Sequence, residues 1–184
     1  MPACTGCNFE NPEGFQFCGR CGVALAPHAT GAEVRKRISV AFCDLVDWTA
    51  LGERLDPESY RRVTTRYYDA MRAVLERHEG RVGKFIGDAV MALFGVPRLH
   101  EDDALRAVRA AAEMLKTMVA LNQDLQREWG VELACRIGVN TGDVLTGDDL
   151  SAEHLVVGDA LNTAARLEQA AGPGEVLLSE ATYG

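Results

Sequence analysis

The chain has 184 residues, enough for one ordinary domain and a small additional unit. Its net charge is −8, which disfavours a general nucleic-acid binder because phosphate neutralisation requires clustered Lys and Arg. No apolar run approaches the roughly 20 residues that span a bilayer, and the N-terminus lacks a signal-peptide pattern. We therefore expect a cytoplasmic protein that binds neither membranes nor nucleic acid.

Residues 1–22 contain four of the six cysteines, as two Cys-x-x-Cys pairs formed by Cys4, Cys7, Cys18 and Cys21. In a cytosolic chain such pairs favour a metal site over disulfides. Each pair lies in a tight turn that directs two thiolates to one point, and four thiolates complete a tetrahedral zinc shell. The segment resembles the zinc ribbon family, so we expect one structural Zn²⁺ and a surface for a protein partner. A redox role for the pairs is the alternative.

Residues 23–36 lack periodicity and contain Pro and Gly, so we interpret them as a linker before a second unit at 37–184. In this unit the patterns predict, in chain order, a strand over 38–42, a helix over 57–79, strands over 81–85 and 89–94, a helix over 101–129, a strand over 132–140, a turn at 141–143 into 144–145, a short strand over 155–157, a helix over 159–170 and a strand over 175–178. This order indicates an α+β fold of ferredoxin-like type, an antiparallel sheet with helices on one face.

Two aspartates lie beside apolar strands of this unit. Asp44 ends the run that begins at Ile38, and Asp88 lies in the turn between two further strands. Alone, each is most simply a turn or capping residue. In the predicted topology the first strand lies beside the hairpin, so both carboxylates can reach one point. Such a pair can hold divalent metal ions over a nucleotide triphosphate.

A third segment, Gly158-Asp-Ala-Leu-Asn-Thr-Ala-Ala-Arg, places Asn162 and Arg166 four residues apart, on one helix face. By themselves these are an ordinary solvated amide and a surface cation. The segments around Asp44 and Asp88 and this helix occur in the order found in class III nucleotide cyclases. Residues 37–184 resemble the catalytic domain of that family.

The resemblance implies a set of site residues. Asp44, Asp88 and the backbone carbonyl of Leu45 would bind two Mg²⁺ or Mn²⁺ ions. Lys84 and Leu155 occupy the positions that contact the base, where lysine goes with adenine in this family. Asn162 would orient the ribose and Arg166 would stabilise the α-phosphate in the transition state.

The implied function is an adenylate cyclase that forms 3′,5′-cyclic AMP and pyrophosphate from ATP in intracellular signal transduction. In the family one domain presents the metal aspartates and another presents the Lys, Asn and Arg. A homodimer with two equivalent sites is therefore implied.

Three features depart from the family pattern. Leu155 stands where cyclases usually place Asp or Thr, and leucine cannot hydrogen-bond the base. Asp47 adds negative charge beside the triphosphate. The chain ends at Gly184, before the family's phosphate-binding lysine, so we expect a domain truncated at its C-terminus. These features favour the alternative, a catalytically weak or inactive nucleotide-binding and dimerisation module that regulates a partner or a missing C-terminal domain. A diguanylate cyclase is disfavoured because no Gly-Gly-Asp/Glu-Glu-Phe segment occurs.

Overall fold

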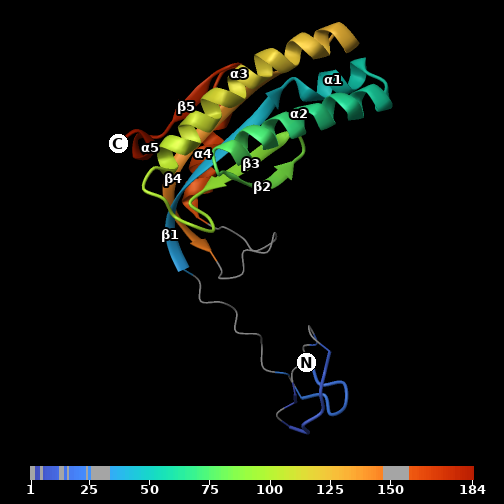
Figure 1. Ribbon diagram of the computed structural model, residues 1–184, viewed down its shortest axis with the longest axis vertical. Helices are drawn as coiled ribbons and strands as arrows, with labels where there is room; N and C mark the ends of the chain where they lie inside the picture. The colour runs from blue at the N-terminus through green and yellow to red at the C-terminus, as the bar shows by residue number, and fades with distance from the viewer. Residues whose placement is uncertain are drawn as a thin grey trace.

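The computed structural model describes residues 3–4, 6–12, 15, 17–23, 25, 34–146 and 158–184, with the backbone alone for 84–86 and 146. Residues 34–146 and 158–184 contain a five-stranded sheet in the order β2-β3-β1-β4-β5 (Figure 1). The strands are β1 (Val34–Val46), β2 (Arg81–Ile86), β3 (Ala89–Phe94), β4 (Ala134–Thr146) and β5 (Val176–Leu178). The helices are α1 (Trp48–Arg54), α2 (Pro57–Arg77), α3 (Asp103–Trp129), α4 (Asp159–Ala170) and α5 (Glu180–Tyr183). The predicted α+β class is confirmed, and α1 and α5 are the two helices that the sequence patterns missed.

The two central strands, β1 and β4, are longer than predicted. They pair antiparallel along their full length, from Val34 opposite Thr146 to Val46 opposite Ala134. The turn expected at residues 141–143 is therefore wrong, and β4 runs straight through it. Strand β1 also begins inside the interval 23–36 that was interpreted as a linker.

The sheet is mixed, whereas the sequence predicted an antiparallel one. Strand β5 is parallel to β4, with Ile137 opposite Val176, and the other strand pairs are antiparallel. The reason is the connection: α4 lies between β4 and β5, and a helical crossover returns the chain in the same direction.

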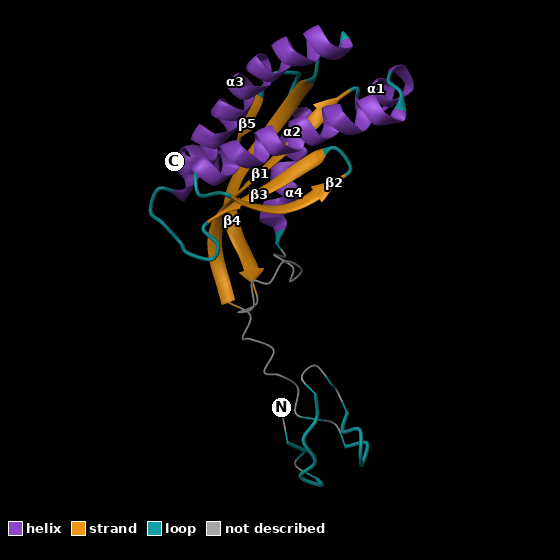
Figure 2. Cartoon of the chain, turned by 45° about the vertical axis from the view of Figure 1, so that its right-hand side comes forward, coloured by secondary structure: helices purple, strands orange, loops and turns teal. Residues whose placement is uncertain are grey.

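Helices lie on both faces of the sheet, which corrects the expectation of one covered face. Figure 2 shows α2 and α3 in front of the strands and α4 behind them. Ala41 and Cys43 of β1 belong to the core under α2 and α3, while Ile38 and Val40 belong to the core under α4. Because β1 is apolar on both sides, it requires cover on both.

Glycine at position 138 lets α4 approach the sheet closely. A Cβ added there would lie 2.2 Å from the backbone nitrogen of Glu168 and 2.3 Å from the carbonyl oxygen of Ala164. Gly142 has the same role nearer the start of α4, where an added Cβ would lie 2.9 Å from the Cβ of Ala160. The backbone of α4 therefore lies directly on β4.

Helix α2 begins and ends for local reasons. The Asp56 carboxylate accepts hydrogen bonds from the N–H groups of Glu58 and Ser59, which caps the helix. Beyond its end, a Cβ at Gly80 would lie 2.6 Å from the Phe94 ring, so that position requires glycine. The residues that α2 buries recur at helical spacing, within the helix predicted over 57–79: Val63, Tyr67, Met71, Val74 and Leu75.

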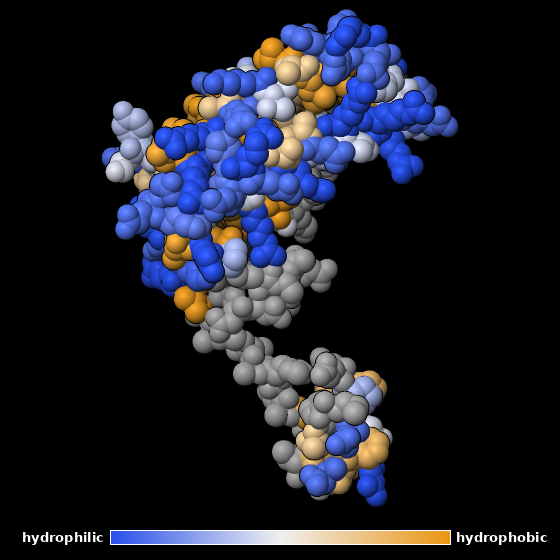
Figure 3. All heavy atoms as spheres, viewed as in Figure 1, coloured by the Kyte–Doolittle hydropathy of each residue, from blue (hydrophilic) through white to orange (hydrophobic). Residues whose placement is uncertain are grey.

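The outward face of α2 and α3 is mostly hydrophilic (Figure 3). Within the described residues, no helix has both the length and the hydrophobicity that crossing a membrane requires. The amphipathic pattern of these two helices thus matches their place on one layer of the domain.

Candidate functional site

Asp44 and Asp88 come together beside the β2–β3 hairpin. The pairing of β1 with β3 ends at Cys43 opposite Val90, so Asp44 directly follows it and Asp88 lies in the adjacent turn. Burial raises the pKa of the Asp88 carboxyl, and Asp44 raises it further through its charge and a side-chain hydrogen bond. The structure thus brings the two carboxylates together, and their role as metal ligands stays a prediction.

The chemistry of this pair suits a hard divalent cation. Two neighbouring carboxylates, of which Asp88 is partly buried, repel each other unless a proton or a cation lies between them. Oxygen ligands of this kind are those that Mg²⁺ prefers. The Leu45 side chain is buried in the core, so only the backbone of that residue remains for the site.

Arg136 and Glu168 belong to the same cluster, and the sequence analysis missed both. Arg136 lies opposite Asp44 in the β1–β4 register, with its Nη2 3.0 Å from Asp44 Oδ2. Its Nε lies 2.6 Å from Oε1 of Glu168, which comes from α4. An arginine within the apolar run of β4, on the side facing α4, is the signal that could have identified this cluster.

Two tyrosines of α2 border Asp88. Tyr68 donates a hydrogen bond from its hydroxyl to the carbonyl oxygen of Gly87. Burial raises the pKa of both Tyr60 and Tyr68, and the charge of Asp88 raises each further. Trp48 of α1 packs on Tyr60 with ring centroids 4.9 Å apart. Tyr60 and Tyr68 therefore border Asp88 on the side of α2.

Asn162 and Arg166 do not face the carboxylates of their own chain. The side of α4 that lies on the sheet is formed by Ala160, Ala164 and Glu168. Asn162 and Arg166 are each two residues from these positions, about 200° around the helix axis, and both are exposed. A single chain therefore presents its carboxylates on one side and its amide and guanidinium on another.

The remaining predicted residues are only partly placed. Lys84 lies in β2 opposite Met91, and its side chain is outside the described residues. Leu155 is also outside them, as is the strand expected over 155–157. Asp47 is exposed, and its backbone is left-handed, with φ of 58°, just before α1.

The four N-terminal cysteines form a second candidate site. Their sulfur atoms all lie within 4.8 Å of one another, and the separations are 3.5 Å for Cys4–Cys21 and 3.6 Å for Cys7–Cys18. A tetrahedral zinc site with bonds of about 2.3 Å has sulfur–sulfur edges of about 3.8 Å. The cysteines are not disulfide-bonded. The arrangement therefore fits a metal ion.

Backbone amides support the thiolates of this cluster. Gly6 donates its N–H toward the Cys4 sulfur at 3.3 Å, and Arg20 donates toward the Cys18 sulfur at 3.4 Å. Burial alone would raise the pKa of Cys18, but N–H groups of Cys21 and Arg20 outweigh it and lower this pKa to about 6. Such donors stabilise the deprotonated sulfur that a metal requires.

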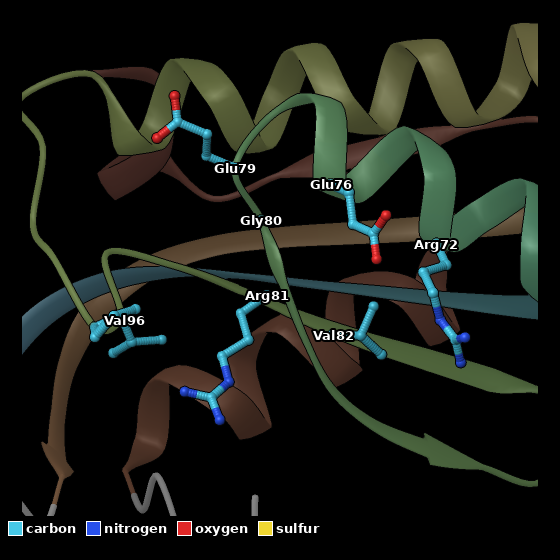
Figure 4. A pocket seen from close by; sticks show the side chains of 8 residues that line it. Arg72, Glu76, Glu79, Gly80, Arg81, Val82 and Val96 are labelled. Atoms are coloured by element: carbon cyan, nitrogen blue, oxygen red, sulfur yellow. The ribbon is translucent and has the colours of Figure 1, made fainter. Parts of the chain in front are cut away.

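Three surface pockets formed by described residues contain none of the predicted site residues. One of about 460 Å³ lies where α2 ends and β2 begins, and Figure 4 shows Arg72 and Glu76 projecting from α2 beside Arg81 of β2. Asp88 is at the other end of β2. Two further pockets, of about 590 and 620 Å³, lie along α2 and α3 and contain none of the predicted residues. The carboxylate pair lies outside all three pockets.

Comparison with known proteins identifies the family to which the chain is similar. A family model described as the adenylate and guanylate cyclase catalytic domain matches residues 31–184. Putative adenylate cyclase 3 of Rhizobium meliloti is 33% identical over 152 residues, which cover 82% of this chain and 23% of that protein. The chain spans about a quarter of the length of the curated relatives it matches.

Solved structures agree with this match. The adenylyl cyclase CyaB from P. aeruginosa superposes with a TM-score of 0.77 at 32% identity, covering 82% of this chain and 80% of that one. The guanylyl cyclase Cya2 superposes with a TM-score of 0.76 at 33% identity, covering 83% and 78%. The similar structures thus include both an adenylyl cyclase and a guanylyl cyclase.

Proposed function

Because the chain belongs to the family of adenylate and guanylate cyclase catalytic domains, we propose that it is an adenylate cyclase that forms 3′,5′-cyclic AMP and pyrophosphate from ATP. The observation that carries the proposal is the meeting of Asp44 and Asp88, with the guanidinium of Arg136 beside them. The choice of ATP rests on Lys84, since the similar solved structures include both adenylyl and guanylyl cyclases.

Asp44, Asp88 and the Leu45 carbonyl would hold two Mg²⁺ or Mn²⁺ ions. When bound, these ions supply the charge that activates the ribose 3′-hydroxyl and neutralises the leaving pyrophosphate. Arg136 adds a fixed positive charge at the same place, which a phosphate oxygen can meet by a charge-assisted hydrogen bond. Tyr60 and Tyr68 border Asp88, and Tyr68 fixes the turn before it through the hydrogen bond to the Gly87 carbonyl oxygen.

The second half of each site would come from a second copy of the chain. Asn162 and Arg166 are exposed on the side of α4 away from the sheet, so they can reach the nucleotide bound to a partner's carboxylates. A two-fold homodimer satisfies both halves at once and contains two equivalent sites. In each of them the amide orients the ribose and the guanidinium stabilises charge on the α-phosphate.

The proposal is tested by measuring cyclic nucleotide formation with Mn²⁺ and either ATP or GTP. Asp44→Ala and Asp88→Ala should each reduce cyclic AMP formation by roughly 100-fold or more, since both remove a ligand of the metal ions. Asp124→Ala, which removes an exposed carboxylate on α3 that pairs with Arg127, is the matched control and should leave the rate unchanged.

Two results would contradict the proposal. Cyclic GMP as the main product would overturn the adenine assignment to Lys84. Tight ATP binding without turnover, in a folded dimer, would favour the nucleotide-binding and dimerisation module instead. The leucine at position 155, which offers the base no hydrogen bond, is the feature that favours that second function.

We also propose that Cys4, Cys7, Cys18 and Cys21 bind one structural Zn²⁺. The support is the sulfur geometry and the amide donors to Cys4 and Cys18. Elemental analysis of the purified chain should give one zinc per chain, and Cys18→Ser should lower this ratio. A chain that is folded in this region and free of zinc would contradict the assignment. The cyclase readout is not needed for this test.

A further inference from the structure

Glu168 is a charged side chain placed where charge is costly. Its side chain is 8% exposed, beneath α4 and against β4. The other buried acid in the described part of the chain, Asp103, has a local role, because it accepts a hydrogen bond from the His100 N–H ahead of α3. Among the described residues, Arg136 is the one ion-pair partner of Glu168. A buried carboxylate persists only when it is paired, so the contact with Arg136 accounts for its presence.

The Arg136 guanidinium is divided between two carboxylates. Its Nη2 lies 3.0 Å from Oδ2 of Asp44, and its Nε lies 2.6 Å from Oε1 of Glu168. The Nε contact is ionic, because neither of its two atoms makes a hydrogen bond of acceptable angle. Arginine and a carboxylate otherwise prefer two parallel N–H···O bonds. Here the Nε side is held by Glu168, and Asp44 receives a single contact.

The backbone of Glu168 is held firmly in this place. An added Cβ at Gly138, two residues after Arg136 on β4, would lie 2.2 Å from the Glu168 backbone nitrogen. The helix and the strand are therefore in direct contact beside the ion pair. The backbone from which the Glu168 carboxylate extends is thus fixed against the strand that carries Arg136.

We infer that Glu168 is a positioning residue that holds the Arg136 guanidinium back, so that Asp44 keeps an oxygen outside the ion pair for a divalent cation. The inference rests on the proposed metal-binding role of Asp44 and Asp88. Without Glu168 the guanidinium can rotate and bind both oxygens of Asp44, in competition with the metal. Glu168 thus acts through Arg136 and touches neither the metal nor the nucleotide.

The test is to measure Mn²⁺ binding to the nucleotide-free chain. The electron paramagnetic resonance signal of free Mn²⁺ reports how much of the ion remains unbound. Glu168→Met, which fills the same space without an acceptor, should weaken binding about tenfold, as loss of a residue behind a metal ligand commonly does. The double variant Arg136→Met with Glu168→Met should bind Mn²⁺ at least as tightly as the parent, because the competing cation is gone. Glu168→Gln keeps an oxygen for Nε and should bind more tightly than Glu168→Met.

A purely structural role predicts a different pattern. If Glu168 only fastened α4, Glu168→Met would lower the melting temperature, and removal of Arg136 would not restore Mn²⁺ affinity. That result would overturn the inference, as would unchanged affinity in Glu168→Met. Glu113→Ala, which removes a carboxylate paired with Arg77 between α2 and α3, is the control and should leave Mn²⁺ binding unchanged.

Asp44→Ala separates the two proposals. If it leaves Mn²⁺ binding intact, the metal site itself is misassigned. If it abolishes binding while Glu168→Met has no effect, the metal site stands and only the positioning role fails.

Discussion

The carboxyl group of Asp88 has a higher pKa in the folded chain than in the unfolded chain. Burial raises its pKa above the ordinary value of 3.8, and the charge of Asp44 adds to this. A raised acid pKa means that the folded state binds the proton more tightly. Stability is therefore highest below the ordinary pKa and declines as pH rises through the raised one. At neutral pH the two ionised carboxylates lower the stability of the folded chain, and a bound cation would offset this repulsion.

Replacing Asp88 with Asn should therefore stabilise the chain while removing a metal ligand. At pH 7, without added Mg²⁺ or Mn²⁺, Asp88→Asn should melt at a higher temperature than the parent. The difference should shrink as pH falls toward 4, because the parent then takes up the proton itself. Melting followed by circular dichroism across this range checks the sign. A variant that melts lower than the parent at pH 7 would contradict the account.

At the scale of elements, the contact between α4 and β4 organises the site. Helix α4 presents Glu168 to the sheet and Asn162 to the outside, so its distance from β4 affects both halves of the proposed machinery. That distance is set where Gly138 lets the helix backbone touch the strand. A glycine in mid-strand is typical of such close approach.

Gly138→Ala should displace α4 from the sheet. An added methyl group at 2.2–2.3 Å from backbone atoms of α4 has no flexible side chain to move aside, and we expect a loss of about 3 kcal/mol in the free energy of unfolding. Denaturant unfolding measures it. Gly52→Ala in α1, where the nearest atom of Tyr60 would be an ordinary 3.4 Å away, is the control and should be neutral or slightly stabilising. Equal effects of the two variants would show that the contact does not set the distance.

At the scale of the whole molecule, the proposed function requires two chains, each contributing one half of each of two sites. The carboxylates of a chain lie beside the hairpin, and its Arg166 faces outward from α4. Activity should accordingly depend on association, and should fall on dilution.

Mixing Asp44→Ala chains with Arg166→Ala chains tests that dependence. Each variant alone should be inactive, because both of its sites lack one component. Random pairing at equal amounts makes half of the dimers mixed, each with one intact site, so about a quarter of the parental activity should return. The measurement is cyclic AMP formation after the two chains have been refolded or expressed together. A mixture as inactive as its components would contradict a shared site.

The sequence by itself determined much of the local structure and most of the candidate residues. Amphipathic spacing located α2, α3 and α4, turn residues located the β2–β3 hairpin, and the short motifs singled out Asp44 and Asp88. These features depend on neighbours within a few residues, which periodicity and turn chemistry register directly.

Only the tertiary structure decided how the elements meet. A continuous β4 instead of a turn at 141–143, the parallel β5 and helices on both faces all depend on contacts between distant segments. The cluster of Asp44, Arg136 and Glu168 also depends on such contacts. Its members come from three elements, and Asp44 and Arg136 are separated by 92 residues. Strand register and helix docking are set by the burial of apolar side chains across the sheet. The role of a charged residue in an apolar run depends on the partner that the fold brings against it.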